Sequence, residues 1–218
     1  MKKIMFNDRY GLTQAVLEGR KTMTRREVKP PNGMTHSDIW NPVMGIDDKG
    51  KVYFTFDCID SKQRDIYPLY QIGEEVAIAQ KYWDLRNCDA FYESLQKADP
   101  TFPLECIKDE RGCDNKMYVK ANWMPRRIRI TNIKAERLQD ISDEDAMREG
   151  IEEHYPYIKW NPNDKLKSYR FRDKKSKYGY YQLSPVRDCF AELINRVSGK
   201  GTWERNPWVF PYEFELLK

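Results

Sequence analysis

Histidine and paired cysteine, the usual ligands of a structural zinc ion, are scarce in this sequence. The 218-residue chain has two histidines, His36 and His154, which lie far apart along it. Its five cysteines are scattered and include no Cys-x-x-Cys pair. Zinc sites need clustered ligands, and secreted disulfide frameworks usually hold an even number of cysteines. We therefore expect no metal site, no cofactor and no disulfide, but reduced thiols in a cytoplasmic protein.

Long apolar runs are also missing. Asp8 and Arg9 interrupt the segment that follows the basic start Met1-Lys2-Lys3. A signal peptide needs an apolar core of about 7 to 15 residues, and a membrane-spanning helix needs about 20. The sequence thus predicts neither an export signal nor a membrane anchor.

Charge of one sign is in only slight excess. The 38 basic and 34 acidic residues give a net charge of +4, but basic residues concentrate in the stretches 20–29 and 159–177. Aromatic residues interleave with the second stretch, and this combination suits single-stranded nucleic acid, which needs charge for phosphates and flat faces for bases. A solvated surface and an insertion that packs its own aromatic residues explain the pattern equally well.

Local patterns predict short helices set between strands. Helices are predicted over 7–19 with Asn7 or Asp8 as the cap, near 90–97, from the cap Ser142 to Glu149, and over 186–197. Strands are predicted over 52–56, 76–80, 117–123, 127–133 and 208–216. The Pro-, Gly- and Asn-rich residues 30–50 indicate a loop. This order predicts one α+β domain over 1–218, with insertions at about 84–116 and 152–185.

Three motifs occur in order along the chain. The first is Gly19-Arg20-Lys21-Thr22-Met23-Thr24-Arg25-Arg26, the second spans 137–150 and ends in Glu149-Gly150, and the third spans 203–209. Together they resemble the ASCH family of the PUA-like superfamily, whose signature is G-x-K-T-x-T-R-R. The third motif and Met124-Pro125-Arg126 resemble the longer members found in phages and prophages. The resemblance implies an α+β fold, a PUA-like β-barrel with short flanking helices and insertions.

The resemblance also implies a catalytic site. Some ASCH proteins hydrolyse N4-acylated cytidine with a Lys, a Thr and a Glu, and the matching positions here are Lys21, Thr24 and Glu149. A desolvated lysine can lose its proton near neutral pH and activate a threonine hydroxyl. A glutamate can hold the lysine or pass a proton to the departing amine. Lys21 and Thr24 can reach one pocket only if a turn or bulge follows Gly19.

Other side chains are candidates for binding a ligand. They are Arg25, Arg26, Trp83, Trp123 and Arg127. Arginine forks suit phosphate or carboxylate, and a tryptophan at a strand end can stack on a base. Surface charge for the arginines and a core position for the tryptophans are the alternatives.

One departure from the family pattern concerns Ala79 and Gln80, where the longer members usually carry an Arg-Glu pair that lines the cavity. We expect first a module that binds RNA, a nucleobase or a nucleotide in a barrel pocket with a basic rim. An amidohydrolase of N4-acylated cytidine is the alternative, with a nuclease as a more distant one. A phage accessory protein with a vestigial pocket is a further alternative. The sequence leaves the ligand and the oligomeric state open.

Overall fold

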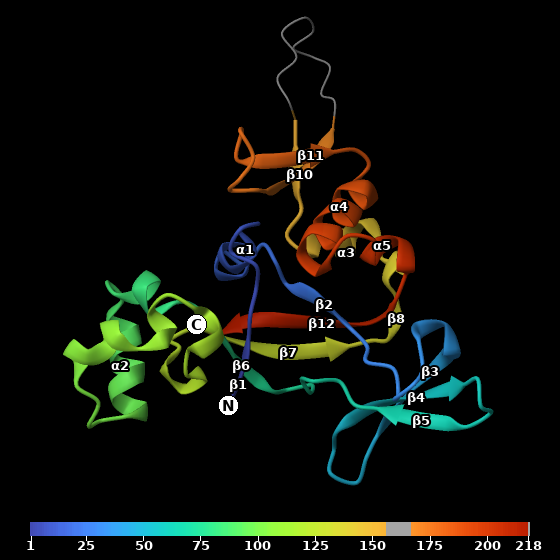
Figure 1. Cartoon of the computed structure of the whole chain (residues 1–218), viewed down its shortest axis with the longest axis horizontal. Coiled ribbons are helices and arrows are strands. Elements are labelled where there is room, and N and C mark those ends of the chain that lie inside the picture. The colour runs from blue at the N-terminus through green and yellow to red at the C-terminus, as the bar shows by residue number, and fades with distance from the viewer. Residues whose placement is uncertain (156–166, 218) are drawn as a thin grey trace, which may run out of the picture.

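The computed structural model describes residues 1–155 and 167–217. Its centre is a curled sheet that forms a half-barrel (Figure 1). The strands lie in the order β1 (Lys2–Ile4), β6 (Glu75–Ile78), β7 (Arg127–Ile133), β12 (Trp208–Leu217) and β2 (Met23–Glu27), and β8 (Glu136–Arg137) pairs with β12. The pair β1–β6 is parallel, and the other pairs of this sheet are antiparallel. The strands β1 and β2 are thus the two edges of the half-barrel.

The strand β7, between β6 and β12, has one buried and one exposed face. Ile128 and Ile130 are buried, whereas Arg129 between them stays exposed and contacts Glu75 and Glu215 on the neighbouring strands. A strand with one apolar face and one wet face is what the sequence of 127–133 predicts, and this prediction is confirmed.

Two smaller antiparallel sheets flank the half-barrel. One contains β3 (Ile39–Ile46), β4 (Val52–Cys58) and β5 (Gln63–Ile66), and the other β9 (Glu152–His154), β10 (Ser168–Arg172) and β11 (Tyr180–Leu183). The prediction of a loop over 30–50 is wrong, because β3 pairs along β4 in spite of Pro42. The pairing shifts between Trp40 and Val43, and this irregularity takes up the proline and Asn41, whose φ is 48°.

The helices are α1 (Leu12–Leu17), α2 (Asp89–Ala98), α3 (Asp143–Arg148), α4 (Val186–Ser198) and α5 (Thr202–Arg205). The predicted helices near 90–97, after Ser142 and over 186–197 are confirmed, and the Ser142 hydroxyl accepts the amide N–H of Asp145 at 3.1 Å. The predicted cap of the first helix is wrong. That helix begins only after Gly11, whose φ of 66° places it in the left-handed region, while Asp8 accepts the hydroxyl of Thr13.

The segment 117–123 forms 3-10 turns and not the predicted strand. These turns are Lys116–Tyr118 and Ala121–Trp123, and Trp123 is 2% exposed. The Trp123 ring packs against the rings of Tyr82 and Phe102, and the segment does not pair as a strand. The result is a second core, separate from that of the half-barrel, in which α2 and the 3-10 turns of the 84–116 region take part.

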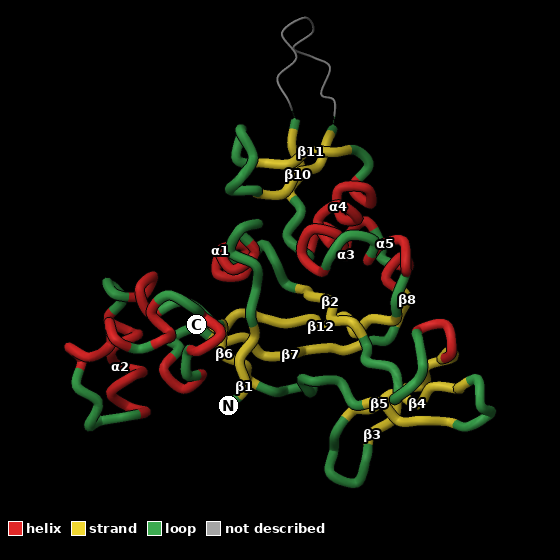
Figure 2. Tube along the Cα trace, viewed as in Figure 1, coloured by secondary structure: helices red, strands yellow, loops and turns green. Residues whose placement is uncertain are grey.

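Figure 2 shows how the helices are distributed around the sheet. The helices α1, α3, α4 and α5 gather beside β2, and α2 lies with the 3-10 turns at the other end of the half-barrel. None of the helices within the described ranges has the length and hydropathy of a membrane span.

Candidate functional site

A small pocket lies where the two edges of the half-barrel approach each other. Residues 5–7, which follow β1, form one wall, and Lys21 and residues 24–26 of β2 form the other. Glu149 lies at its base, and one face of α4 covers it. Across the gap, Arg26 Nη2 donates to the backbone oxygen of Met5 at 2.8 Å. The pocket has a volume of about 50 Å³, and we call it the Lys21 pocket.

Lys21 is buried in this pocket, with 2% of its surface exposed. Its Nζ lies 2.5 Å from Glu149 Oε2 and donates to the backbone oxygen of Glu149 at 2.8 Å. The ring of Phe6 lies 5.9 Å from the same nitrogen. Burial lowers the pKa of Lys21, the contact with Glu149 opposes this shift, and the charges of Arg26 and Arg25 add to it. The ammonium is therefore easier to deprotonate than that of a surface lysine.

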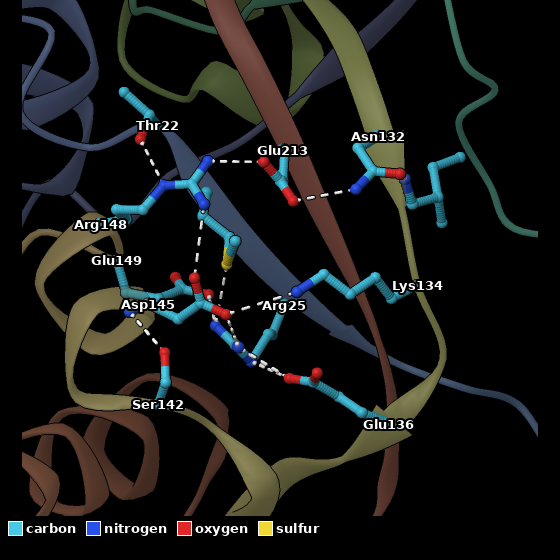
Figure 3. A network of polar contacts seen from close by, with 12 residues as sticks. Thr22, Arg25, Asn132, Lys134, Glu136, Ser142, Asp145, Arg148, Glu149 and Glu213 are labelled. Atoms are coloured by element: carbon cyan, nitrogen blue, oxygen red, sulfur yellow. Dashed lines mark hydrogen bonds and ion pairs between the residues drawn. The ribbon is translucent and has the colours of Figure 1, made fainter.

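Arg25 forms the centre of a network of carboxylates on the other side of Glu149 (Figure 3). Its Nη1 donates to Glu149 Oε1 at 3.1 Å, and its Nη2 donates to Glu136 Oε1 at 2.7 Å and to Asp145 Oδ2 at 3.2 Å. Burial by itself would lower the pKa of Arg25, but Glu149 and Glu136 raise it. Because its fork is occupied by protein carboxylates, Arg25 orients Glu149 and is not available to a phosphate.

A second arginine extends the network towards β12. Arg148 contacts Asp145 at 3.4 Å, donates to Thr22 Oγ1 at 3.2 Å and donates to Glu213 at 2.8 Å (Figure 3). These contacts join the end of α3 to β12 and to the residue that follows Lys21. The position of Lys21 relative to Glu149 is therefore fixed from several directions.

Backbone turns bring Lys21 and Thr24 to the same pocket. Gly19 has a φ of 74°, and the N–H groups of Arg20 and Lys21 both donate to the oxygen of Ala15. Lys21 consequently lies before β2, which begins only at Met23. Strand alternation therefore does not separate Lys21 from Thr24, and the turn that the sequence required is present.

Two local features place the remaining groups. Glu149 ends α3, and Gly150 turns the chain with a φ of 102° where a Cβ would lie 3.3 Å from Leu12 and 3.7 Å from Lys21. Thr24 is 6% exposed and lines the pocket. Within the described ranges, its hydroxyl has no hydrogen-bond partner in the protein. The Thr24 hydroxyl oxygen is not fully buried but opens onto the pocket, where a ligand can bond to it.

The structure gathers some of the predicted residues and separates others. Lys21, Thr24, Arg25, Arg26 and Glu149 all line the Lys21 pocket.

Trp83, Trp123 and Arg127 lie elsewhere. Trp83 is 56% exposed and stacks against Arg86, and Trp123 is buried in the second core. Arg127 faces Glu75 across the sheet. None of these three belongs to the lining that the described residues form.

Other lining residues were not identified from the sequence. Phe6 and the α4 residues Phe190, Leu193 and Ile194 form an apolar wall, and Glu136 and Asp145 hold Arg25 from behind. The amphipathic pattern of 186–197 identified the apolar face of α4 but not the pocket that it covers. Glu136 carries no sequence signal that distinguishes it from a surface carboxylate.

The departure at Ala79 and Gln80 lies outside the Lys21 pocket as the described residues form it. Ala79 belongs to the second core. Gln80 lines a different hollow, together with Asp84 and Arg172. The polar groups of the Lys21 pocket are therefore assembled without any contribution from these two positions.

The second basic stretch divides into paired and exposed lysines and arginines. Lys167 and Arg170 contact Glu153 and Glu152 on β9, whereas Lys174, Lys175 and Lys177 are exposed. Lys159 and Lys165 lie outside the described residues.

Comparison of the chain with protein-family models, with curated proteins and with solved structures finds no match.

Proposed function

We propose that this chain is an ASCH-type, PUA-like protein that binds a cytosine nucleobase, of RNA or of a free nucleoside or nucleotide, in the Lys21 pocket. One observation carries the proposal: Lys21, Thr24, Arg25 and Glu149 are all buried around one pocket with an apolar wall. Ligand sites typically combine apolar walls with a few convergent polar groups. Burying charges costs several kcal/mol per ion, so such a cluster is a candidate for function.

A purely structural ion-pair network is the competing explanation. It accounts for Arg25, whose fork is filled, but leaves Thr24 without a role. Larger hollows occur elsewhere, such as one of about 220 Å³ between α1 and β10, but its lining Arg20 is paired with Glu18 and Glu152 at the surface. Exposed ion pairs of this kind are common and carry little functional information.

The size of the Lys21 pocket sets a condition on binding. At about 50 Å³ it is far smaller than typical ligand pockets, which have about 300 to 1,000 Å³. A base therefore enters only if the side chains of α4 that cover the pocket, among them Phe190 and Leu193, move outward. The apolar faces of these side chains would then cover the base.

A second candidate function, hydrolysis of an N4-acylated cytosine, is favoured by the contact of Lys21 with Glu149 beside Thr24. Neutral Lys21 would take the proton of the Thr24 hydroxyl while the oxygen of that hydroxyl attacks the acyl carbon. The proton would then pass to the departing amino nitrogen as the C–N bond breaks, which leaves an ester on Thr24. Water would hydrolyse this ester, release the carboxylic acid and restore the hydroxyl. Backbone N–H groups would have to stabilise the oxyanion, because Arg25 is already occupied.

The test measures binding and turnover separately. Calorimetric titration with cytidine reports binding, and chromatographic detection of cytidine released from N4-acetylcytidine reports hydrolysis. The Thr24→Val variant keeps the shape of the side chain and disturbs no ion pair, and the Thr24→Ser variant keeps the hydroxyl. We expect cytidine binding by the wild type and Thr24→Ser, weaker binding by Thr24→Val and, if the chain is a hydrolase, turnover that Thr24→Val abolishes and Thr24→Ser partly retains.

Two results would count against these proposals. Absence of binding by the folded wild-type protein, to cytidine and to its phosphate-bearing forms alike, would refute the nucleobase pocket. Binding without any release of cytidine would refute the hydrolase and leave the binding function in place.

A further inference from the structure

Of the cations that line the Lys21 pocket, Arg26 alone forms no ion pair with a carboxylate of the described residues. Lys21 lies on Glu149, and Arg25 lies on Glu149, Glu136 and Asp145. Arg26 makes a hydrogen bond to the backbone oxygen of Met5, and no ion pair joins it to any described residue. Its charge is therefore uncompensated at the place where the two edges of the sheet meet.

The position of Arg26 is at the entrance of the pocket and not at its base. Arg26 is half-buried, whereas Lys21 and Glu149 are buried. Its charge lies close enough to Lys21 to lower the pKa of that lysine, so both cations serve the same cavity. Asn7 and Ser198 border the pocket as well and add a side-chain amide and a hydroxyl.

We propose that Arg26 binds a phosphate attached to the bound nucleoside, so that the ligand is a nucleotide or an RNA residue and not a free nucleoside. This inference rests on the proposed function, because it takes the base to lie in the Lys21 pocket. An arginine fork that uses one N–H on Met5 keeps other N–H groups for phosphate oxygens. A base held at Lys21 and Thr24 would direct its sugar and phosphate towards the entrance.

One electrostatic effect opposes the proposal. The helix α4 ends at Ser198 beside the pocket, and the C-terminal end of a helix carries about half a negative charge. Arg26 carries a full positive charge and makes a direct contact, so the arginine outweighs the helix end. The helix end reduces the increase in affinity expected from the phosphate but does not turn it into a decrease.

The test compares cytidine with cytidine 5′-monophosphate, cytidine 3′-monophosphate and a short single-stranded RNA by calorimetric titration. We expect the wild-type protein to bind at least one phosphate-bearing ligand about 10- to 100-fold more tightly than cytidine. Arg26→Ala should reduce this affinity to that for cytidine, and Arg26→Lys should retain part of the gain. The monophosphates and the RNA distinguish a free nucleotide from a polymer as the source of the phosphate.

Arg86→Ala is the matched control. Arg86 is exposed and, like Arg26, donates to one backbone oxygen, that of Trp83, but it lies outside the pocket. The Arg86→Ala variant should therefore bind all four ligands with the affinities of the wild type. The inference would be overturned if cytidine bound as tightly as the phosphate-bearing ligands, or if Arg26→Ala did not remove their higher affinity. The proposed function would stand in both cases. Failure of all four ligands to bind would overturn both.

Discussion

At the scale of single residues, the main question is how the fold tolerates a buried ammonium group. Taking an ion out of water costs several kcal/mol, and a partner offsets this only with good geometry. Lys21 has two acceptors from Glu149, and Arg25 holds the other carboxylate oxygen of that residue. This arrangement also explains why a glutamate is tolerated at the end of α3, where the helix dipole disfavours negative charge.

Replacing Lys21 by methionine should change how stability depends on pH. Burial lowers the pKa of Lys21 below its ordinary value of 10.5, so the unfolded chain binds more protons than the folded one between the lowered pKa and 10.5. Within that window the stability of the wild-type protein should rise with pH relative to Lys21→Met, by at most about 1.4 kcal/mol per pH unit. Urea unfolding of both proteins at several pH values between 7 and 10 measures this difference.

Lys2→Met provides the control for that experiment. Lys2 is exposed and contacts Glu74 at 2.9 Å, so Lys2→Met removes one lysine charge from the surface and leaves the Lys21 pocket intact. A difference between wild type and Lys21→Met that stayed flat or fell with pH would show that the fold does not depress the pKa of Lys21.

At the scale of secondary-structure elements, α4 connects two parts of the molecule. One face covers the Lys21 pocket, and Arg196 on the same helix contacts β11 and the residue after β10. The carboxylate of Asp173, which is 2% exposed, accepts from Arg196 at 2.8 Å and from Arg9 at 3.2 Å. This cluster holds α4 against the sheet of β9, β10 and β11 and so helps to keep the pocket covered.

Asp173→Asn should destabilise the protein by about 1.5 to 3 kcal/mol, the range for hydrogen bonds that involve charged groups. The larger penalty of a fully buried orphan charge does not apply, because both arginines retain contact with water. Burial by itself would raise the pKa of Asp173, but the Lys175 amide and the two arginines lower it. The difference in free energy of unfolding between Asp173→Asn and wild type should therefore hold above pH 3.8 and shrink as the pH falls below that value.

Thermal and urea unfolding measure this effect, with Glu192→Gln as the control. Glu192 also contacts Arg196, at 2.5 Å, but does so at the surface of α4. Its loss should cost no more than about 0.5 kcal/mol, as for other exposed pairs four residues apart on a helix. Equal losses in the two variants would contradict a special role of Asp173.

Elements with strong periodicity could be predicted from the sequence, and elements that depend on distant partners could not. The alternation of 127–133 and the amphipathic pattern of 186–197 define β7 and α4 within one or two residues. In contrast, β3 contains Pro42 and a residue with positive φ, and only pairing with β4 makes it a strand. The aromatic residues of 117–123 favour a strand locally, but Trp123 packs into the second core.

The candidate site shows the same division. The motif around Lys21 pointed to residues that the structure brings together, because the turn after Gly19 is a local feature. The helix α4, which covers the pocket, and the carboxylates that bind Arg25 lie more than 100 residues away from this motif in the sequence. Such partners follow from the folded topology and not from a local pattern. For the same reason the sequence does not show that Trp83 and Trp123, which it predicts as ligand-binding residues, lie outside the pocket.

At the scale of the whole molecule, exposed charge is spread over distant surfaces. Lys174, Lys175 and Lys177 lie between β10 and β11, and within the described ranges none of them forms an ion pair. Tyr178, which is 80% exposed, lies beside Lys177. Figure 1 places this turn at the far side of the molecule from the sheet of β3, β4 and β5. Positive charge next to an exposed aromatic ring is a combination that single-stranded nucleic acid can use.

If RNA extends over this surface, replacing Lys174, Lys175 and Lys177 together by serine should weaken its binding and reduce the dependence on salt. Each phosphate contact on a single strand contributes about 0.7 to the slope of log affinity against log salt concentration, so the slope should fall by up to about 2. Fluorescence anisotropy of a labelled RNA at several salt concentrations measures both quantities. The control replaces Lys49, Lys51 and Lys62, exposed lysines near β3, β4 and β5, and thus removes the same charge. Equal weakening by both variants would attribute the effect to net charge, and only a selective loss would place RNA on the turn between β10 and β11.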